Sequence, residues 1–435
     1  MIKHLKTTNI GPMTEMELDF SKRLNLFTGD NGLGKSFLLD IVWRCLTGSW
    51  AAEINQKLII GKEAIPNRGL EGKIDFTLVE NNKNIQHEIR HYKNNIQPWS
   101  NVNDYKLSDL VIYAMADDSF AVCDPYRSHL QSVPLASVGV ISCEYVFSPS
   151  EVWEGLINKE NTWMCNGLIR DWASWQKEKG LPFEHFKDVL KVLSPSTEEL
   201  LEPGELTRIS INDVRDIPTV RMSYNQDVPV VHASSAMRRI IALAYILVWT
   251  WEEHIQAAKL LGKPVVNQIT FLIDEIESHL HPSWQRKIIK ALLSVMEKLS
   301  PDVKVQLITT THSPLIMASV EPLFDAEQDA WFDFNFEQGK ENSRLKNPIV
   351  TLQKFDFEKQ GDAANWLTSE AFDLKSSRSI ESEQLLEKAS TLLQNGNADS
   401  TSVGAIYDEL LKALGPKDDF LFRWRAICQK RGLLA

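Results

Sequence analysis

Alternating apolar and polar positions mark the first thirty residues of the chain. Met16, Leu18 and Phe20 alternate with polar residues, and a second apolar run, LNLF, covers 24–27. A period of two residues is typical of strands, so we expect two short strands here. The stretch GDNGLGKS follows, and then FLLDIVWRCL, in which the apolar residues have helical spacing. The pattern therefore predicts a strand, a glycine-rich turn and a helix, in that order.

The pattern changes twice in the middle of the chain. Between 58 and 125 the runs LII, KIDFTLVE, IQHEIRHY, LVIYAM and FAVCDP are strand-like, which indicates an antiparallel lobe. From about 150 to 200 the spacing becomes helical and tryptophan is frequent. Gly and Pro residues keep each of these helices short. Residues 205–230 are expected to be extended.

Helices and strands alternate in the second half of the chain. We expect a helix over 235–260, the strand ITFLID, a helix from Pro282 to about 299 and the strand VQLITTTH. Residues 325–350 are polar, and we expect a loop there. A short strand, IVTLQKF, and helices within ESEQLLEKASTLLQ, GAIYDELLKAL and FLFRWRAICQKRG complete the prediction.

Size and composition limit the class of protein. At 435 residues the chain is longer than one hydrophobic core usually allows, so we expect one large unit or two to three smaller ones. A net charge of −11 argues against a uniformly basic nucleic-acid-binding surface but leaves a local basic groove open. The five cysteines form no C-x-x-C pair, which predicts reduced core thiols. The longest apolar window, 240–249, is about half the length of a membrane-spanning helix, and the first residues lack a signal-peptide pattern, so we expect a soluble, cytoplasmic protein.

The stretch GDNGLGKS matches the pattern G-x-x-x-x-G-K-[ST] in full. Its backbone N–H groups are expected to cradle phosphate oxygens, and the following helix presents its positive end to the same anion. Lys35 would reach the β- and γ-phosphates, and Ser36 would ligate Mg²⁺. A glycine loop with an incidental lysine is the alternative, which the flanking strand and helix disfavour. The predicted nucleotide-binding residues of this loop are Gly29, Asp30, Asn31, Gly32, Leu33, Gly34, Lys35, Ser36 and Phe37.

Two consecutive carboxylates, Asp274 and Glu275, end the apolar strand ITFLID. We expect Asp274 to hold Mg²⁺ through water and Glu275 to polarise the water that attacks the γ-phosphate. Acidic pairs after apolar strands are common, so the assignment depends on the complete phosphate-binding loop upstream.

A histidine, His312, ends the strand VQLITTTH, where it could sense the γ-phosphate and orient the attacking water. The loop ESHLHP at 277–282 precedes that strand. Its two histidines have no evident third metal ligand nearby, and Pro282 is typical of the first turn of a helix, whose start the histidines could cap. We expect this loop at the edge of the site, placed to touch a second subunit.

The order of these motifs resembles the ABC-type ATPase domain of the OLD and SMC-like branch. The residues that carry the resemblance are GDNGLGKS, the helix start HASSAMRR at 232–239, IDEIESHLHPSWQ and TTTHSP. It covers about 1–125 and 230–320, and the tail only through WLTSEAFDLKSSRS at 366–379. The resemblance implies an α/β fold of the ABC-type P-loop NTPase kind, with a mixed sheet, an antiparallel lobe, a helical insert and a helical C-terminal tail. It also implies ATP and Mg²⁺ as cofactors and ATP hydrolysis by Lys35, Glu275 and His312, with Ser36 and Asp274 on the metal.

In that branch, two ATPase domains enclose two ATP molecules, and each site includes a Ser-x-Gly motif from the partner's helix start. Carried over to this sequence, Ser234 has the serine place, Ser235 the variable place and Ala236 the glycine place. Ala236 departs from the pattern, since its methyl group restricts how closely a phosphate approaches. A serine that only caps an apolar helix is the alternative. Gln131 is the candidate for the glutamine that links the two lobes to the γ-phosphate, and its assignment stays open.

The motifs divide the chain into four expected parts. Residues 1–125 form the N-terminal half of the ATPase, and 126–229 form a helical, tryptophan-rich insert that matches no motif. Residues 230–345 carry the serine-rich helix start, the acidic pair and His312, and 346–435 form a helical tail.

The resemblance implies a sensor or switch that dimerises around ATP and controls a separately encoded effector, as in the anti-phage systems Septu and PARIS. The tail has no Asp-x-Asp or His-Asn-His nuclease pattern, so we expect no nuclease activity in this chain and a nuclease effector encoded nearby. Self-association into a homodimer or higher homo-oligomer is expected, without a membrane partner, and nucleic-acid binding stays open.

Three other functions are compatible with a nucleotide site. A DNA-repair ATPase of the SMC-like type would need a long coiled coil or a basic groove, which the short insert and the net charge disfavour. A transporter's nucleotide-binding subunit fits the HLHP loop and the tail less well. An assembly scaffold for a nuclease, clamped by ATP, differs from the switch in what hydrolysis does to the effector.

Overall fold

The computed structural model describes residues 1–80, 83–91, 99, 109–127, 144–337, 349–394, 399–415 and 418–434. These residues form two compact units, Met1–Gly361 and Asp362–Ala435. Gln131 and Cys143 lie outside the described residues, and the four-part division expected from the sequence stays a prediction.

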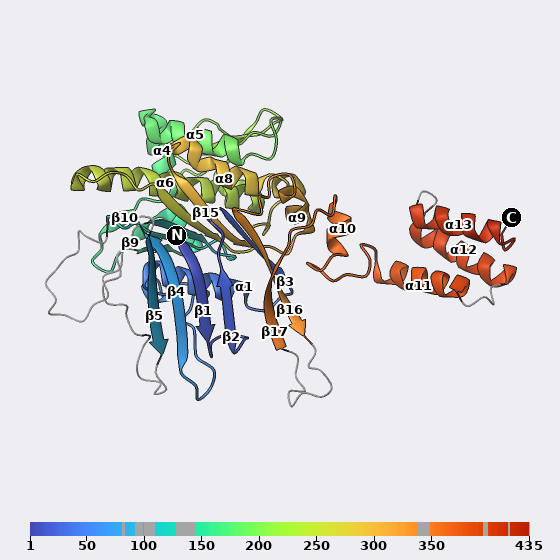
Figure 1. Cartoon of the computed structure of the whole chain (residues 1–435). Helices are drawn as coiled ribbons and strands as arrows, with labels where there is room; N and C mark the ends of the chain where they lie inside the picture. The colour runs from blue at the N-terminus through green and yellow to red at the C-terminus, as the bar shows by residue number, and fades with distance from the viewer. Residues whose placement is uncertain are drawn as a thin grey trace. The chain divides into compact units, whose positions relative to one another are not determined.

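A mixed sheet of eight strands forms the centre of the first unit, in the order β17-β16-β3-β15-β14-β6-β7-β8 (Figure 1). The run from β16 to β6 is parallel, whereas β17, β7 and β8 are antiparallel to their neighbours. Its strands are β3 (Leu24–Gly29), β6 (Leu110–Ala114), β7 (Phe120–Cys123), β8 (Glu144–Phe147), β14 (Gln268–Ile273), β15 (Lys304–Thr310), β16 (Asp329–Glu337) and β17 (Ile349–Phe355).

A second, antiparallel sheet has the order β2-β1-β4-β5. Its strands are β1 (Ile2–Thr8), β2 (Glu15–Asp19), β4 (Gly72–Glu80) and β5 (Lys83–His91). In β2 the side chains of Met16 and Leu18 are buried and the three acidic residues between and beside them are exposed, as the period of two predicts.

Helix α1 (Lys35–Thr47) packs into a core that both sheets share. Leu38 and Val42 of α1 belong to one apolar cluster with Phe76 of the antiparallel sheet and Ile308 of the mixed sheet. Contact with both sheets explains why Ser36 is the only residue of α1 that is exposed. The first turn of α1 is thereby fixed at the end of β3.

The remaining helices of the first unit include α4, α5, α6 and α8, which lie on the side of the mixed sheet away from β1, β2, β4 and β5 (Figure 1). Small two- and three-stranded sheets accompany them. The helix bounds are α2 (Ala51–Ile54), α3 (Pro149–Glu154), α4 (Leu168–Glu178), α5 (Leu181–Leu193), α6 (Ser235–Leu261), α7 (Pro282–Gln285), α8 (Ile288–Leu299) and α9 (Pro314–Val320). The short strands are β9 (Leu156–Ile157), β10 (Trp163–Cys165), β11 (Glu202–Pro203), β12 (Thr219–Arg221) and β13 (Asp227–Pro229).

The second unit is helical and has its own small core. It consists of α10 (Ala363–Leu367), α11 (Ile380–Gln394), α12 (Ser400–Leu414) and α13 (Asp419–Lys430). Trp424 of α13 is buried and donates a hydrogen bond from Nε1 to the Ala389 carbonyl of α11 at 3.1 Å. The three tail helices expected from the sequence are confirmed.

Three predictions about strands are wrong. The first thirty residues contain β1 as well as the two expected strands, and LII at 58–60 is not a strand. The run LVIYAM forms β6, which pairs in parallel with β14 in the mixed sheet and does not belong to the antiparallel lobe. Every residue of β6 is buried, and a continuous apolar run does not reveal which sheet a strand joins.

The segment expected to be a loop at 325–350 contains β16. Its polar residues misled the prediction because two aspartates are buried in the strand with partners. Asp329 pairs with Arg23, and Asp333 accepts a hydrogen bond from the Thr28 hydroxyl at 2.5 Å. Within the parts of the chain that the structure describes, no helix combines the length and the hydropathy that crossing a membrane requires.

Candidate active site

The predicted catalytic motifs meet at one edge of the mixed sheet. β3, β15 and β14 are neighbours and run in parallel, so their carboxyl ends lie side by side. The glycine-rich loop follows β3, the acidic pair follows β14, and the loop with His312 follows β15 between them. This edge is where open parallel sheets commonly bind ligands.

Backbone geometry explains the glycine that opens the loop. Gly29 has φ 124°, and a Cβ atom there would lie 2.3 Å from the Phe334 carbonyl oxygen of the neighbouring strand. Any side chain would therefore clash with β16 as well as strain the backbone. Gly34, with φ 105°, caps the N-terminus of α1 without a side chain in front of the helix N–H groups.

Lys35 folds back over this loop. Its Nζ donates hydrogen bonds to the carbonyls of Gly29 at 2.8 Å and Asp30 at 2.7 Å. Burial lowers the pKa of Lys35, while Asp274 and other nearby carboxylates oppose the shift. Ser36 is exposed, Leu33 is buried, and the partly buried Phe37 ring lies against Gly11.

Thr310 ties the acidic pair to the neighbouring strand. Its hydroxyl donates a hydrogen bond to Asp274 Oδ1 at 2.7 Å and accepts one from the Glu275 N–H at 2.7 Å. Asp274 is buried, and Glu275 is partly buried with φ 46°, a left-handed conformation that is uncommon for glutamate. Thr310 was not among the residues predicted from the sequence, although the three consecutive threonines at this strand end were a usable signal.

His312 is held beside the phosphate-binding loop by Glu277. The Glu277 carboxylate accepts hydrogen bonds from the backbone N–H of His312 at 2.5 Å and from the Thr311 hydroxyl at 2.7 Å. Burial lowers the pKa of the His312 imidazole, and the charge of Lys35 lowers it further. The neutral ring is therefore favoured at physiological pH, which leaves it able both to donate and to accept a hydrogen bond.

The HLHP loop caps a helix, as predicted. His281 Nδ1 accepts a hydrogen bond from the Ser283 N–H at 3.3 Å, and Pro282 occupies the first turn of α7. Among the described residues, no cluster of three or more His, Cys, Asp or Glu side chains could hold a metal ion.

Asp40, one turn beyond Ser36 on α1, was also not among the residues predicted from the sequence. Its carboxylate accepts a hydrogen bond from the Tyr113 hydroxyl of β6 at 3.0 Å. Burial raises the pKa of Asp40 to about 7, and the nearby Asp274 carboxylate raises it further, against the effect of Tyr113. The signal was its four-residue spacing from Ser36, which places both on one face of α1.

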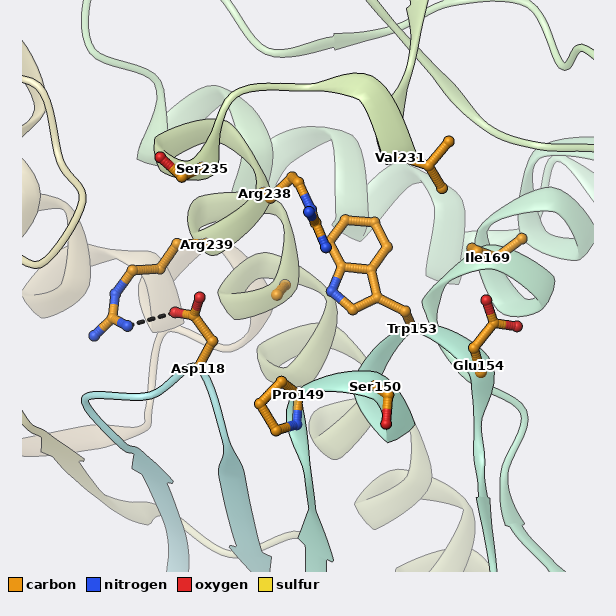
Figure 2. Close-up of a pocket in the computed structure, with 11 residues that line it drawn as sticks. Asp118, Pro149, Ser150, Trp153, Glu154, Ile169, Val231, Ser235, Arg238 and Arg239 are labelled. Carbon is orange, nitrogen blue, oxygen red and sulfur yellow. Dashed lines mark hydrogen bonds and ion pairs between the residues drawn. The ribbon is translucent and has the colours of Figure 1, made fainter. Parts of the chain in front are cut away.

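The serine-rich helix start lies in a hollow of its own, of about 410 Å³ (Figure 2). Ser234 and Ser235 are exposed and Ala236 is buried, and the Ser234 hydroxyl accepts a hydrogen bond from the Met237 N–H at 3.3 Å. Ser234 is thus a helix cap in this chain, as the alternative interpretation expects. The lining of the hollow comprises Asp118, Pro149, Ser150, Trp153, Glu154, Ile169, Val231, Ser235, Arg238, Arg239 and Ala242.

The predicted site residues therefore form two groups. One group lies at one sheet edge and comprises the glycine-rich loop, Asp274, Glu275 and His312. Lys35 is close enough to two of them for charge effects on pKa: Asp274 raises the pKa of Lys35, and Lys35 lowers the pKa of His312. Ser235, at the start of α6, lines a hollow to which no residue of the glycine-rich loop contributes.

Comparisons with known proteins agree with this geometry. Residues 4–115 match a family described as "AAA domain", and residues 132–318 match one described as "AAA domain, putative AbiEii toxin, Type IV TA system". The Septu protein PtuA of Bacillus thuringiensis is 22% identical over 326 residues, which is 72% of this chain and 72% of PtuA. The "Retron Ec83 probable ATPase" of Escherichia coli is 29% identical over 164 residues, which is 37% of this chain and only 25% of that protein.

Among solved structures, the chain is similar to an SmcHead bound to the C-winged helix domain of ScpA. The TM-score is 0.43 at 14% identity, and the match covers 82% of this chain and 98% of the other. With AAA-domain matches over residues 4–115 and 132–318, the chain belongs to the AAA-domain ATPases, as a distant homologue of the Septu protein PtuA and of the retron ATPase.

Proposed function

We propose that the chain binds ATP with Mg²⁺ at the edge formed by β3, β15 and β14 and hydrolyses it there. The observation that carries the proposal is the joint fixation of Asp274 and Glu275 by the Thr310 hydroxyl, next to Lys35 and His312. A phosphate-binding loop alone would support binding. The adjoining carboxylate pair and neutral imidazole support hydrolysis as well.

Each side chain has a separate role in this proposal. Lys35 exchanges its hydrogen bonds with loop carbonyls for bonds to the β- and γ-phosphates. The exposed Ser36 hydroxyl and the Asp274 carboxylate are oxygen donors, which suit Mg²⁺. The metal would offset charge on the phosphates. Glu275 accepts a proton from the attacking water, and His312 orients that water by a hydrogen bond.

A second copy of the chain completes the site in this proposal. The exposed Ser234 and Ser235 lie at the N-terminus of α6, whose N–H groups favour an anion. The hollow that Ser235 lines includes no residue of the chain's own glycine-rich loop, which supports contact with a nucleotide held by another copy. The assembly is a homodimer with two ATP molecules between the copies.

We further propose that this dimer switches a separately encoded effector, a nuclease encoded nearby, in anti-phage defence. The similarity to the Septu protein PtuA over 72% of both chains supports a defence role. The proposed roles in DNA maintenance and as an ATP-clamped scaffold are the alternatives. Purification of the chain together with the products of neighbouring genes, with and without ATP, identifies the effector.

Measurement of phosphate release by the purified chain tests the central proposal. Lys35→Ala should abolish ATP binding, and Glu275→Gln should retain ATP binding and reduce turnover by about 100-fold, as expected for loss of a general base. Turnover that survives in both variants would exclude this site. A Lys57→Ala variant, in which an exposed lysine paired with Glu151 is lost, is the matched control.

A further inference from the structure

Arg239 connects the start of α6 to a turn of the mixed sheet. It lies one helical turn after Ser235 and is buried, with 7% of its surface exposed. Its Nη1 donates hydrogen bonds to Asp118 Oδ1 at 2.5 Å and to the carbonyls of Met115 and Ala116 at 3.4 and 3.5 Å. Figure 2 shows this guanidinium directed at Asp118.

The other nitrogen of the same guanidinium reaches the acidic pair that follows β14. Arg239 Nη2 donates hydrogen bonds to the carbonyl of Asp274 at 3.2 Å and to that of Glu275 at 3.5 Å. Glu275 is held from the opposite side, because its N–H donates to Thr310. A residue with a positive φ needs such support, since its backbone is strained. Arg239 and Thr310 therefore both restrain the peptide units around Glu275.

Arg238, the residue before it, has a different environment. Its side chain is exposed, and its guanidinium lies 5.0 Å from the centre of the Trp153 ring (Figure 2). Two adjacent arginines thus diverge from one helix start. Of these two arginines, Arg239 is the one that contacts the backbone of the acidic pair.

We propose that Arg239 is a positioning residue that couples the start of α6 to Glu275 of the same chain. The inference rests on the proposed function, in which α6 of one copy touches the nucleotide of the other. A helix turn and a planar guanidinium are both rigid, so a shift of the α6 start on contact with that nucleotide displaces the hydrogen bonds on the Asp274 and Glu275 carbonyls. ATP bound in one site thereby sets the position of the general base in the other site.

Coupling of this kind makes turnover depend cooperatively on ATP concentration. Each site becomes fully competent only when the other nucleotide engages the helix that carries Arg239. The Hill coefficient for ATP turnover by the unaltered dimer is therefore above one. A buried arginine with a purely structural role would change stability and would leave the Hill coefficient alone.

Arg239→Lys tests the coupling. Lysine keeps the charge that pairs with Asp118. Arg239 contacts Asp118 and the two carbonyls of the acidic pair with two different nitrogens, and the single nitrogen of lysine cannot occupy both positions. We expect ATP affinity of the monomer within about twofold of the unaltered chain, kcat lower by about tenfold and a Hill coefficient close to one, because coupling free energies of this size are typical. Arg221→Lys, which alters the Arg221–Asp227 ion pair of the β12–β13 hairpin, is the matched control and should leave all three unchanged.

Asp118→Asn is the second variant and guards against misfolding of the first. Asp118 is 39% exposed, so its substitution perturbs packing little. In this variant Arg239 keeps its hydrogen bonds to the Asp274 and Glu275 carbonyls but loses its ion pair with Asp118. The Hill coefficient should fall, and kcat should decrease by about threefold, which is less than the decrease expected for Arg239→Lys. Unchanged kcat and Hill coefficient in Arg239→Lys, or a Hill coefficient of one in the unaltered dimer, would overturn the coupling. If Lys35→Ala and Glu275→Gln abolish turnover in the same assay, only the coupling fails and the proposed function stands.

Discussion

The Thr310 hydroxyl donates a hydrogen bond to Asp274 Oδ1 at 2.7 Å, from one parallel strand to the end of the next. The same oxygen accepts the N–H of Glu275. One buried hydroxyl thus orients the proposed metal-binding carboxylate and the backbone of the proposed general base. Neither contact is visible in the sequence, because β14 and β15 become neighbours only in the sheet.

Thr310→Val should reduce ATP turnover by about tenfold and raise the Mg²⁺ concentration for half-maximal activity. Valine keeps the shape of the side chain but removes both hydrogen bonds, and a bond to a charged group contributes about 1.5–3 kcal/mol. Steady-state kinetics across a magnesium titration measures both effects.

Thr270→Val in β14 is the matched control for this prediction. The Thr270 hydroxyl is buried and has no hydrogen-bond partner among the described residues. Its loss should leave turnover unchanged and should not lower the free energy of unfolding. Equal kinetic effects of the two substitutions would show that the Thr310 hydrogen bonds do not matter for activity.

Ser234→Arg should leave ATP binding by the monomer intact and abolish hydrolysis in the dimer. The exposed Ser234 precedes Ser235, which lines a hollow without any residue of the chain's own glycine-rich loop, so we expect an arginine at 234 to obstruct only a nucleotide held by a partner. Isothermal titration with ATP and a turnover assay on the same preparation separate the two effects. Ser234→Thr, which keeps the hydroxyl and the helix cap, should retain most of the activity. Hydrolysis by Ser234→Arg at the normal rate would refute a contact in trans.

Glu275→Gln should separate a switch from a scaffold. With hydrolysis stopped and ATP still bound, the dimer stays assembled, because the contacts across the nucleotide are unchanged. A scaffold would then hold its effector as well as before or better, whereas a switch would fail to release or activate it. Size-exclusion chromatography of the co-purified complex, with and without ATP, measures retention of the effector, and a nuclease assay on the same fractions distinguishes the models, because only the switch predicts that activation of the effector is lost.

Asp40→Asn should stabilise the chain in a manner that depends on pH. Because burial raises the pKa of Asp40 to about 7, the folded protein binds a proton more tightly than the unfolded chain does. The free energy of unfolding therefore falls as pH rises from about 4 to about 7, where the carboxyl ionises in an unfavourable setting. Asparagine removes this loss.

We expect Asp40→Asn to be more stable than the unaltered chain by on the order of 2 kcal/mol at pH 8 and about equal to it at pH 4. Urea unfolding at both pH values, with EDTA and without nucleotide, measures the difference. Asp302→Asn, at an exposed turn before β15, is the control. A gain that is the same at both pH values would mean that ionisation of Asp40 is not its cause.

Short-range patterns in the sequence were sufficient to predict the local structure around the candidate site residues. The glycine-rich loop between a strand and a helix, the acidic pair after ITFLID and the histidine after VQLITT all lie where local patterning places them. The tail helices and the cap by His281 were equally local. Neighbouring residues determine these features, because the backbone hydrogen bonds of helices and the alternation of strands depend on few positions.

Long-range pairing decided the rest. Only the sheet order places the His312 loop between the glycine-rich loop and the acidic pair, and burial together with the Asp274 carboxylate raises the pKa of Asp40. β6 and β16 were misassigned because partners more than 150 residues away in the chain, β14 and β3, determine where they pair. The sequence by itself determined which groups could act on a nucleotide. The tertiary structure decided which of them meet, because the hydrogen bonds of Thr310 and Arg239 join residues that are neighbours only after folding.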